Sequence, residues 1–212
     1  MAGGRGSRFQ NQNKGLVLLK NKALIEHVIT RIAPQVDQLS ISCNRNLDQY
    51  QTILDQNRGS FQSTTHNRCL KDDDKDTLSG PLAGISRFLM DCSHEFLFIC
   101  PCDTPLLPHD LIFRLLNHLK KSKVDACFPS DNHRKQHLIL LIKRDAAIYA
   151  MQQLRSNTPL SCVRSPSIRD WLSHLNYSEL YCNDENLNWS NINDQQELER
   201  IDLACDQHSS TS

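Results

Sequence analysis

The feature that most limits the possible folds is an apolar run from Glu95 to Cys100 that ends at once in Pro101-Cys102-Asp103-Thr104-Pro105. Strands buried on both faces of a parallel sheet have such uninterrupted apolar sequences, whereas half-exposed strands alternate apolar and polar residues. Proline cannot continue the ladder of backbone hydrogen bonds, so the strand stops there. The run therefore predicts a central strand, with Asp103 just beyond its carboxyl end.

Strand-like and helix-like patterns alternate along the rest of the chain. Helices are expected near 23–32, 80–90, 111–119 and 145–154, and strands near 38–43, 95–100, 126–128 and 138–142. This alternation predicts a doubly wound α/β fold, with a mainly parallel, Rossmann-like sheet and helices on both faces. The 212 residues suit a single domain over 1–205, followed by a polar tail over 206–212 that is expected to be disordered.

Charge and hydropathy exclude several classes of partner. Lys plus Arg and Asp plus Glu number 24 each, so the formal net charge of zero offers no general attraction to nucleic acid or to an anionic membrane. Any recognition of phosphate must then be local. No apolar run is long enough to span a membrane, and the first residues lack the apolar segment of a secretory signal. A cytoplasmic location is expected.

Cysteine and histidine spacing gives no sign of a zinc site. The nine cysteines contain no Cys-x-x-Cys pair, and the nine histidines do not recur four residues apart around a carboxylate. Cys100 and Cys102 would share one face of a strand without completing a ligand set. We expect reduced, mostly buried thiols.

The first residues have the composition of an anion-binding loop. Three glycines occur within five positions from Ala2 to Gly6, which favours irregular backbone. Without side chains, Gly3 and Gly4 would let backbone N–H groups approach a triphosphate, while Arg8 and Lys14 would supply positive charge. The alternative for these two cations is ordinary solvated surface charge.

Polar residues at strand ends and helix starts extend this candidate site. Asp103 is held between two prolines where it must face ligand or solvent, and Mg²⁺ prefers one or two carboxylates combined with phosphates and water. Asn44 follows the strand near 38–43 and could read a base or ribose edge. Gly80-Pro81 opens a helix and could set rigid backbone beside the base. The alternatives are a capping aspartate, a turn asparagine and an ordinary first-turn proline.

These segments resemble, in order and spacing, the molybdenum cofactor guanylyltransferase family. The resemblance covers nearly the whole chain, is strongest over 1–120, and is weaker at Ser167-Ile168-Arg169-Asp170-Trp171-Leu172. It is carried by Ala2-Gly3-Gly4-x-Gly6-x-Arg8 with Lys14-Gly15-Leu16, Asn44-Arg45, Gly80-Pro81-Leu82-Ala83-Gly84, Pro101-Cys102-Asp103-Thr104-Pro105 and Asn191-Ile192-Asn193.

The family resemblance implies an activity: transfer of GMP from GTP to the terminal phosphate of molybdopterin, with release of pyrophosphate. Mg²⁺ is the implied cofactor, and molybdoenzymes with their specific chaperones are implied partners. The implied catalytic residues are Lys14, Arg8 and Asp103, with Asp103 also binding the metal. The implied nucleotide-binding residues are Ala2, Gly3, Gly4, Lys14, Asn44, Asp73, Gly80, Pro81 and Asp103, and the implied pterin-binding residues are Asn191 and Asn193.

Some of these assignments have alternatives. The neighbouring Asp72 and Asp74 leave the register of Asp73 open by one residue, and the whole triplet could be a solvated loop. Asn193 or Asp194 could instead cap the helix that follows. For the whole protein, the alternatives are a related enzyme that uses CTP or forms a sugar nucleotide, and a non-catalytic GTP- or pterin-binding protein that delivers cofactor.

The sequence departs from the family pattern at two places. The family's Met-Gly-Gly-x-Asp-Lys is Phe9-Gln10-Asn11-Gln12-Asn13-Lys14 here, which removes two glycines and one carboxylate. In addition, Met1 stands where the family's first strand ends, directly before Ala2-Gly3-Gly4. We expect this first, central strand to be supplied by residues upstream of Met1, or to be lost in a degraded copy.

Overall fold

The computed structural model describes residues 13–57, 59, 67–72, 78–131, 135–158, 165–182, 191–192 and 194–201. Its helices are α1 (Leu24–Ile32), α2 (Leu47–Gln56), α3 (Pro81–Asp91), α4 (Leu111–Ser122), α5 (Arg144–Asn157) and α6 (Ile168–Leu172), besides 3-10 turns η1 (Lys14–Leu16) and η2 (Ala33–Gln35) and a helix over 195–201. Its strands are β1 (Leu18–Leu19), β2 (Lys22–Ala23), β3 (Ser40–Ser42), β4 (Arg68–Leu70), β5 (Phe96–Ile99), β6 (Ala126–Ser130), β7 (Leu140–Lys143) and β8 (Tyr177–Tyr181).

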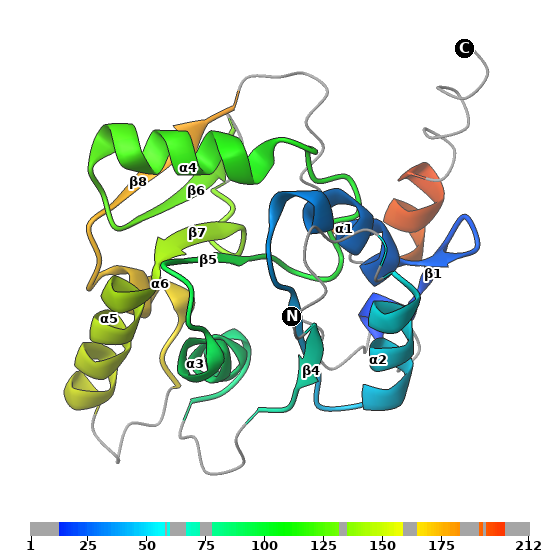
Figure 1. Ribbon diagram of the computed structural model, residues 1–212, viewed down its shortest axis with the longest axis horizontal. Helices are drawn as coiled ribbons and strands as arrows, with labels where there is room; N and C mark the ends of the chain where they lie inside the picture. The colour runs from blue at the N-terminus through cyan, green and yellow to red at the C-terminus, as the bar shows by residue number, and fades with distance from the viewer. Residues whose placement is uncertain are drawn as a thin grey trace.

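Helices cover both faces of the main sheet. This sheet has the order β5-β7-β6-β8, and a separate parallel pair is formed by β3 and β4. In Figure 1, α4 lies over one face of the main sheet, and α3 and α5 lie on the other side. The predicted α/β class with helices on both faces is therefore confirmed. Among the helices of the described ranges, none is long and apolar enough to cross a membrane.

Strand β7 is an exception to the expected parallel arrangement. It pairs antiparallel with both β5 and β6, whereas β6 pairs parallel with β8. The sheet is thus mixed. A parallel connection needs a crossover of a dozen or more residues, commonly with a helix, and the chain between Ser130 and Leu140 is too short for one.

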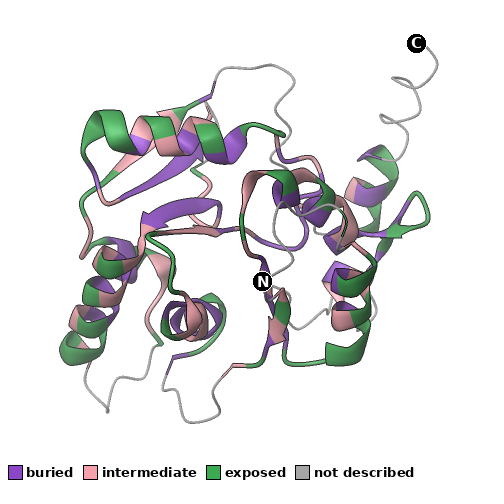
Figure 2. Ribbon diagram, in the orientation of Figure 1, coloured by how far each residue is buried: buried purple, intermediate pink, exposed green. Residues whose placement is uncertain are grey.

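The core forms two layers because successive strand side chains point to opposite faces of the sheet. Cys127 and Leu141 pack in a cluster with α1, α2 and α4. Ala126, Phe128 and Leu140 pack in a second cluster with α3, α5 and α6. Figure 2 shows β6 and β7 as buried, while the outer faces of the helices are exposed. Both faces of β6 and β7 therefore exclude water. The run from Glu95 to Cys100 was predicted to form a central strand, but in the described part of the chain β5 lies at the edge of the main sheet, and three of its four residues are only partly buried.

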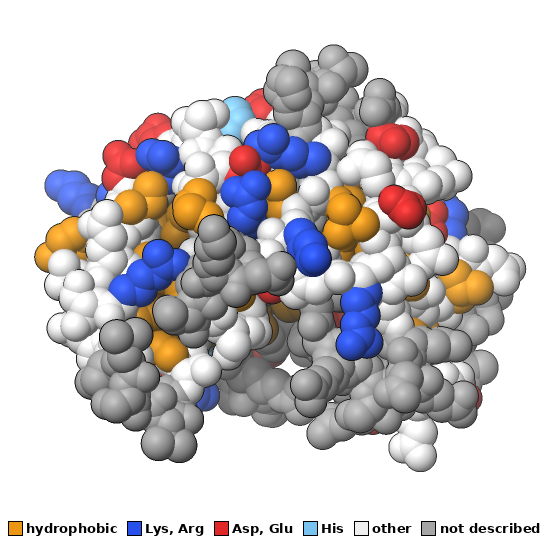
Figure 3. Space-filling view, turned by 90° about the horizontal axis from the view of Figure 1, so that it is seen from below, with side chains coloured by type: hydrophobic (Ala, Val, Ile, Leu, Met, Phe, Trp, Pro, Cys, Tyr) orange, Lys and Arg blue, Asp and Glu red, His pale blue; other side chains and the backbone are white. Residues whose placement is uncertain are grey.

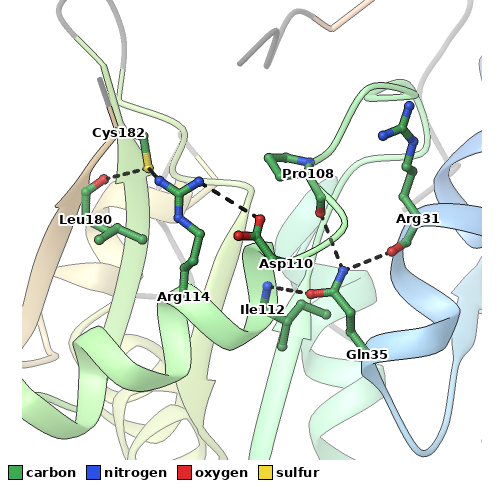
Figure 4. A network of polar contacts seen from close by, with 8 residues as sticks. All are labelled: Arg31, Gln35, Pro108, Asp110, Ile112, Arg114, Leu180 and Cys182. Atoms are coloured by element: carbon green, nitrogen blue, oxygen red, sulfur yellow. Dashed lines mark hydrogen bonds and ion pairs between the residues drawn. The ribbon is translucent and has the colours of Figure 1, made fainter. Parts of the chain in front are cut away.

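Gln35 joins the end of α1 to the beginning of α4 (Figure 4). Its Nε2 donates to the carbonyl of Arg31 at 2.9 Å and to that of Pro108 at 3.5 Å, and its Oε1 accepts the backbone N–H of Ile112 at 2.9 Å. The first N–H groups of a helix have no partner within the helix, so this side chain satisfies one of them. The loop from Asp103 to α4 is thereby held against α1.

Candidate active site

An ion pair between Lys14 and Asp103 forms the centre of the candidate site. Asp103 follows β5, as predicted, and its side chain is only 8% exposed, against 26% for Lys14. Oδ2 contacts the lysine, whereas the buried Oδ1 has no hydrogen-bond partner among the described residues. A buried carboxylate oxygen without a partner is costly, so this atom is a position where a ligand would be stabilising.

Close packing around Gly15 fixes the position of Lys14. A Cβ added at Gly15 would lie 2.5 Å from the hydroxyl of Tyr50 and 3.2 Å from Sγ of Cys102, so only glycine fits. The fully buried Tyr50 donates its hydroxyl to Oδ1 of Asn13 at 2.6 Å. Asn13, which stands where the family pattern has an aspartate, is therefore held against α2 directly before Lys14.

A second polar cluster lies at the carboxyl ends of β3 and β4. Nδ2 of Asn44 donates to Oδ2 of Asp72 at 2.8 Å, and the backbone N–H of Asp72 donates to Oδ1 of Asn44 at 3.0 Å. Oγ of Ser42 donates to Oδ1 of the same carboxylate at 3.0 Å. These bonds fix the Asn44 amide and leave it one donor hydrogen and one acceptor lone pair. Asp72 and Ser42 were not among the predicted site residues, although Asp72 belongs to the aspartate triplet.

The segment predicted to contact the pterin lies beside Asp103. The backbone N–H of Ile192 donates to the carbonyl of Asp103 at 2.9 Å, and the Ile192 side chain is fully buried. This bond brings the neighbouring Asn191 to the candidate site. Oδ1 of Asp194 accepts the N–H of Glu197 at 2.9 Å, so Asp194 caps the helix over 195–201, one of the two capping residues considered.

The remaining predicted residues are not joined to this centre. Gly80 has a φ of +62°, which favours glycine, and Pro81 begins α3. Within the described part of the chain, no hydrogen bond or ion pair connects either residue to Lys14, Asn44 or Asp103. Six further predicted residues lie outside the described ranges: Ala2, Gly3, Gly4, Arg8, Asp73 and Asn193.

Asp103 is the best candidate for holding a metal ion. The described residues contain no cluster of three or more His, Cys, Asp or Glu side chains able to bind one. Burial raises the pKa of the neighbouring Cys102 thiol to about 11. Mg²⁺ is bound by oxygen rather than sulfur ligands, so this thiol is not expected to hold it. Mg²⁺ fits such a site, because it is commonly bound by one or two carboxylates together with substrate phosphates and water.

On the face seen in Figure 3, the described Lys and Arg side chains do not form one continuous basic patch. Lys and Arg side chains are spread over this face, with neutral and acidic side chains between most of them. This distribution agrees with the formal net charge of zero.

The fold and these side chains define a class of protein. A buried carboxylate and an oriented amide follow the carboxyl ends of strands in an α/β fold, and a cation pairs with the carboxylate; such sheets bind ligands at these ends. The class is that of the α/β nucleotidyltransferases. The chain belongs to the MobA-like NTP transferase domain family, whose model matches residues 1–175.

Sequence relatives and solved structures agree with this family. Over 148 residues the chain is 37% identical to a molybdenum cofactor guanylyltransferase of Shewanella halifaxensis. The match covers 68% of this chain and 65% of that relative, which is just under two thirds of the relative's length. Molybdopterin-guanine dinucleotide biosynthesis protein A of Archaeoglobus fulgidus superposes with a TM-score of 0.69 and 21% identity over 97% of this chain and 96% of that one. A 4-diphosphocytidyl-2C-methyl-D-erythritol synthase of Anaerococcus prevotii superposes with a TM-score of 0.70 and 8% sequence identity, over 91% of this chain and 93% of that one. The two structures indicate the shared fold.

Proposed function

We propose that the protein transfers GMP from GTP to the terminal phosphate of molybdopterin, forming the guanine dinucleotide cofactor and pyrophosphate. The observation that carries this proposal is the Lys14–Asp103 ion pair at the end of β5, in which one buried carboxylate oxygen lacks a protein partner. The 37% identity to a relative named molybdenum cofactor guanylyltransferase favours this reaction over cytidylyl or sugar-nucleotide transfer.

The reaction needs no protein nucleophile. A terminal phosphate oxygen of molybdopterin forms a bond to the α-phosphorus of GTP, and the bond from that phosphorus to the oxygen bridging the α- and β-phosphates breaks. The bridging oxygen leaves with pyrophosphate. Phosphoryl-type transfer depends mainly on positioning and on stabilising the charge that develops on oxygen. Lys14 supplies a positive charge for these oxygens, and Arg8 together with the backbone of Ala2, Gly3 and Gly4 is proposed to share this role.

Asp103 is the proposed magnesium ligand, through the Oδ1 atom that has no partner among the described residues. When bound, the ion would neutralise charge on the phosphates and fix their orientation. The backbone bond from Ile192 to the carbonyl of Asp103 holds the main chain at this position. The carboxylate can thus exchange ligands while its backbone stays in place.

Substrate recognition is assigned to the residues on either side of this centre. Asn44, with its amide fixed by Asp72, retains one donor and one acceptor for the ribose or base. Asp73, Gly80 and Pro81 are proposed to complete the nucleotide site. Asn191, adjacent to the Ile192 bond, and Asn193 are proposed to contact the pterin.

The proposed cellular setting follows from the same reaction. Substrates and product are soluble phosphate compounds, and we place the reaction in the cytoplasm. The product would pass to molybdoenzymes, with their specific chaperones as proposed partners.

A turnover assay tests the proposed function. The chain, GTP, molybdopterin and Mg²⁺ should release pyrophosphate and form the dinucleotide in equal amounts. GTP should be preferred to CTP in direct competition, because a site that hydrogen-bonds one base leaves buried polar groups unpaired with another, at about 1–3 kcal/mol each. Equal use of CTP would contradict the guanylyl assignment. GTP binding by the folded chain without pyrophosphate release would instead indicate a delivery protein.

A further inference from the structure

Two thiols lie against each other on the β3–β4 pair. Ile41 of β3 stands opposite Cys69 of β4, and Cys43 follows Ile41 by two residues. Successive side chains of a strand point to opposite faces, so the side chains of Ile41, Cys43 and Cys69 share one face. The Cys43 and Cys69 thiols are hydrogen-bonded to each other, and both are reduced. The two sulfur atoms are therefore placed to react with each other.

Helix α2 covers this face of the strand pair. Tyr50 is fully buried near both thiols, and Oε1 of Gln51 accepts the backbone N–H of Cys69 at 3.2 Å. Cys43 is fully buried as well, whereas Cys69 is only partly buried. Solvent therefore reaches the pair at Cys69, and the burial of Cys43 favours a small oxidant such as hydrogen peroxide over a bulky one.

The contact between the two thiols distinguishes them from other buried cysteines. The hydrogen bond from Cys69 lowers the pKa of the Cys43 thiol, although burial acts in the opposite direction. The same bond, together with burial, raises the pKa of Cys69. By contrast, burial raises the pKa of Cys127 to about 12 and that of Cys100 to about 11. Because the thiolate is the form that peroxide oxidises, Cys43 should react before these two.

The thiol pair adjoins the polar cluster at the carboxyl ends of β3 and β4. Asn44 directly follows Cys43, and Asp72 follows Cys69 by three residues. The N–H of Cys43 donates to the carbonyl of Leu70 at 2.9 Å, immediately before the two bonds between Asn44 and Asp72. A movement of one strand end along the other would therefore change the contacts of Asn44.

A disulfide between the two cysteines requires such a movement. Cys43 and Cys69 are diagonal neighbours, two residues apart in register. With strands about 4.8 Å apart and a rise of about 3.3 Å per residue, their Cα atoms should be about 8 Å apart. A disulfide needs a Cα separation below about 7 Å, so the end of β3 must shift by about 1–2 Å toward Cys69. This shift pulls Cys43 away from Leu70 and Asn44 away from Asp72.

We propose that Cys43 and Cys69 form a reversible redox switch, in which hydrogen peroxide converts the two thiols to a disulfide and moves Asn44 out of its nucleotide-binding position. The Cys43 thiolate sulfur bonds to one peroxide oxygen as the O–O bond breaks, and the other oxygen takes up a proton and leaves as water. The Cys69 sulfur then bonds to the sulfur of the resulting sulfenic acid, and the hydroxide that leaves takes the Cys69 proton to form a second water. Two thiols are oxidised, one peroxide is reduced, and a dithiol reductant reverses the change. The effect on nucleotide rests on the proposed function, whereas disulfide formation does not.

Peroxide treatment followed by peptide mapping tests the chemistry. The full chain receives one equivalent of hydrogen peroxide, is quenched with an alkylating reagent in denaturant, and is digested for mass spectrometry. The Cys43–Cys69 disulfide should form at least about tenfold faster than any other cysteine is oxidised, and dithiothreitol should reverse it. Cys43→Ser should abolish the disulfide, whereas the control Cys92→Ser, at the end of α3, should not alter it. Disulfides that join other cysteines first, or a pair that stays fully alkylated while other thiols oxidise, would overturn the proposal.

Hydrogen exchange and nucleotide binding test the movement. In the oxidised chain the N–H of Cys43 should exchange at least about tenfold faster, because its bond to Leu70 is broken. Binding of Mg²⁺–GTP should weaken by about tenfold or more and recover with dithiothreitol. Cys69→Ser should bind Mg²⁺–GTP equally with and without peroxide.

These measurements separate the redox switch from the proposed function. Equal GTP affinities of the reduced and oxidised chains, or unchanged exchange at Cys43, would overturn the switch. If the reduced chain binds no GTP, the proposed function fails, and exchange at Cys43 alone decides whether the disulfide moves the end of β3.

Discussion

Replacing Gly15 with alanine should destabilise the protein by about 2–6 kcal/mol. The new methyl group would lie 2.5 Å from the Tyr50 hydroxyl, well inside contact distance, and 3.2 Å from Sγ of Cys102. Overpacking of this kind costs about 1–3 kcal/mol. Displacing the hydroxyl would also break its 2.6 Å bond to Asn13, and an unpaired buried polar group costs about 1–3 kcal/mol.

Urea denaturation of matched variants measures this cost. Gly59→Ala is the control, because nothing lies within 4 Å of a Cβ at Gly59, and its effect should stay within about 0.5 kcal/mol. In a Tyr50→Phe background the clashing oxygen is absent, so Gly15→Ala should cost clearly less there. If Gly15→Ala is no more harmful than Gly59→Ala, or if its cost is the same with phenylalanine at position 50, the packing argument is refuted.

Three further predictions concern charge. Asp103→Asn should keep the Tm within a few degrees but reduce turnover at limiting Mg²⁺ by at least about a hundredfold, because the amide loses the metal-binding charge; unchanged turnover would remove this residue from the site. Lys14→Ala should weaken use of GTP far more than Lys121→Ala on the exposed end of α4, as measured by kcat/KM, and equal effects would make Lys14 ordinary surface charge. Burial raises the pKa of Cys102 from 9.0 to about 11, so the unfolded thiol ionises first and stability should fall between about pH 9 and 11, by about 1.4 kcal/mol per pH unit. Denaturation under reducing conditions should show a shallower fall for Cys102→Ala, and an identical slope would contradict this origin.

The sequence predicted the elements with strong apolar patterns. The helices α1, α3, α4 and α5 and the strands β3, β5, β6 and β7 all lie within a few residues of their expected positions. Helix α2 was not anticipated, because only Tyr50 and Leu54 are buried in an otherwise polar segment. Strand β4 has three residues, and only Leu70 is buried. Such elements are fixed by tertiary contacts more than by local pattern.

In the candidate site, too, local patterns were predictable from the sequence, whereas contacts between distant residues were not. Asp103 follows a strand with a clear signal, and its position came from local sequence. Its pairing with Lys14, and the bonds of Asp72 with Asn44, join residues far apart in the chain. Periodicity does not encode such contacts. The clearest available signal was the aspartate triplet, which could not indicate which member faces Asn44.

The Lys14–Asp103 ion pair has a consequence for which ligands the site admits. Each charge already compensates the other, and because Asp103 is the buried partner, moving Lys14 away without a replacement would leave a buried carboxylate unpaired. An anion alone would pair with Lys14 and leave Asp103 unpaired. A cation alone would pair with Asp103 and leave Lys14 unpaired. A ligand that presents a cation and an anion together exchanges one ion pair for two and leaves no buried charge alone. If the protein has the proposed function, we expect the pair to favour a metal–nucleotide complex over free nucleotide, free metal ion or inorganic phosphate.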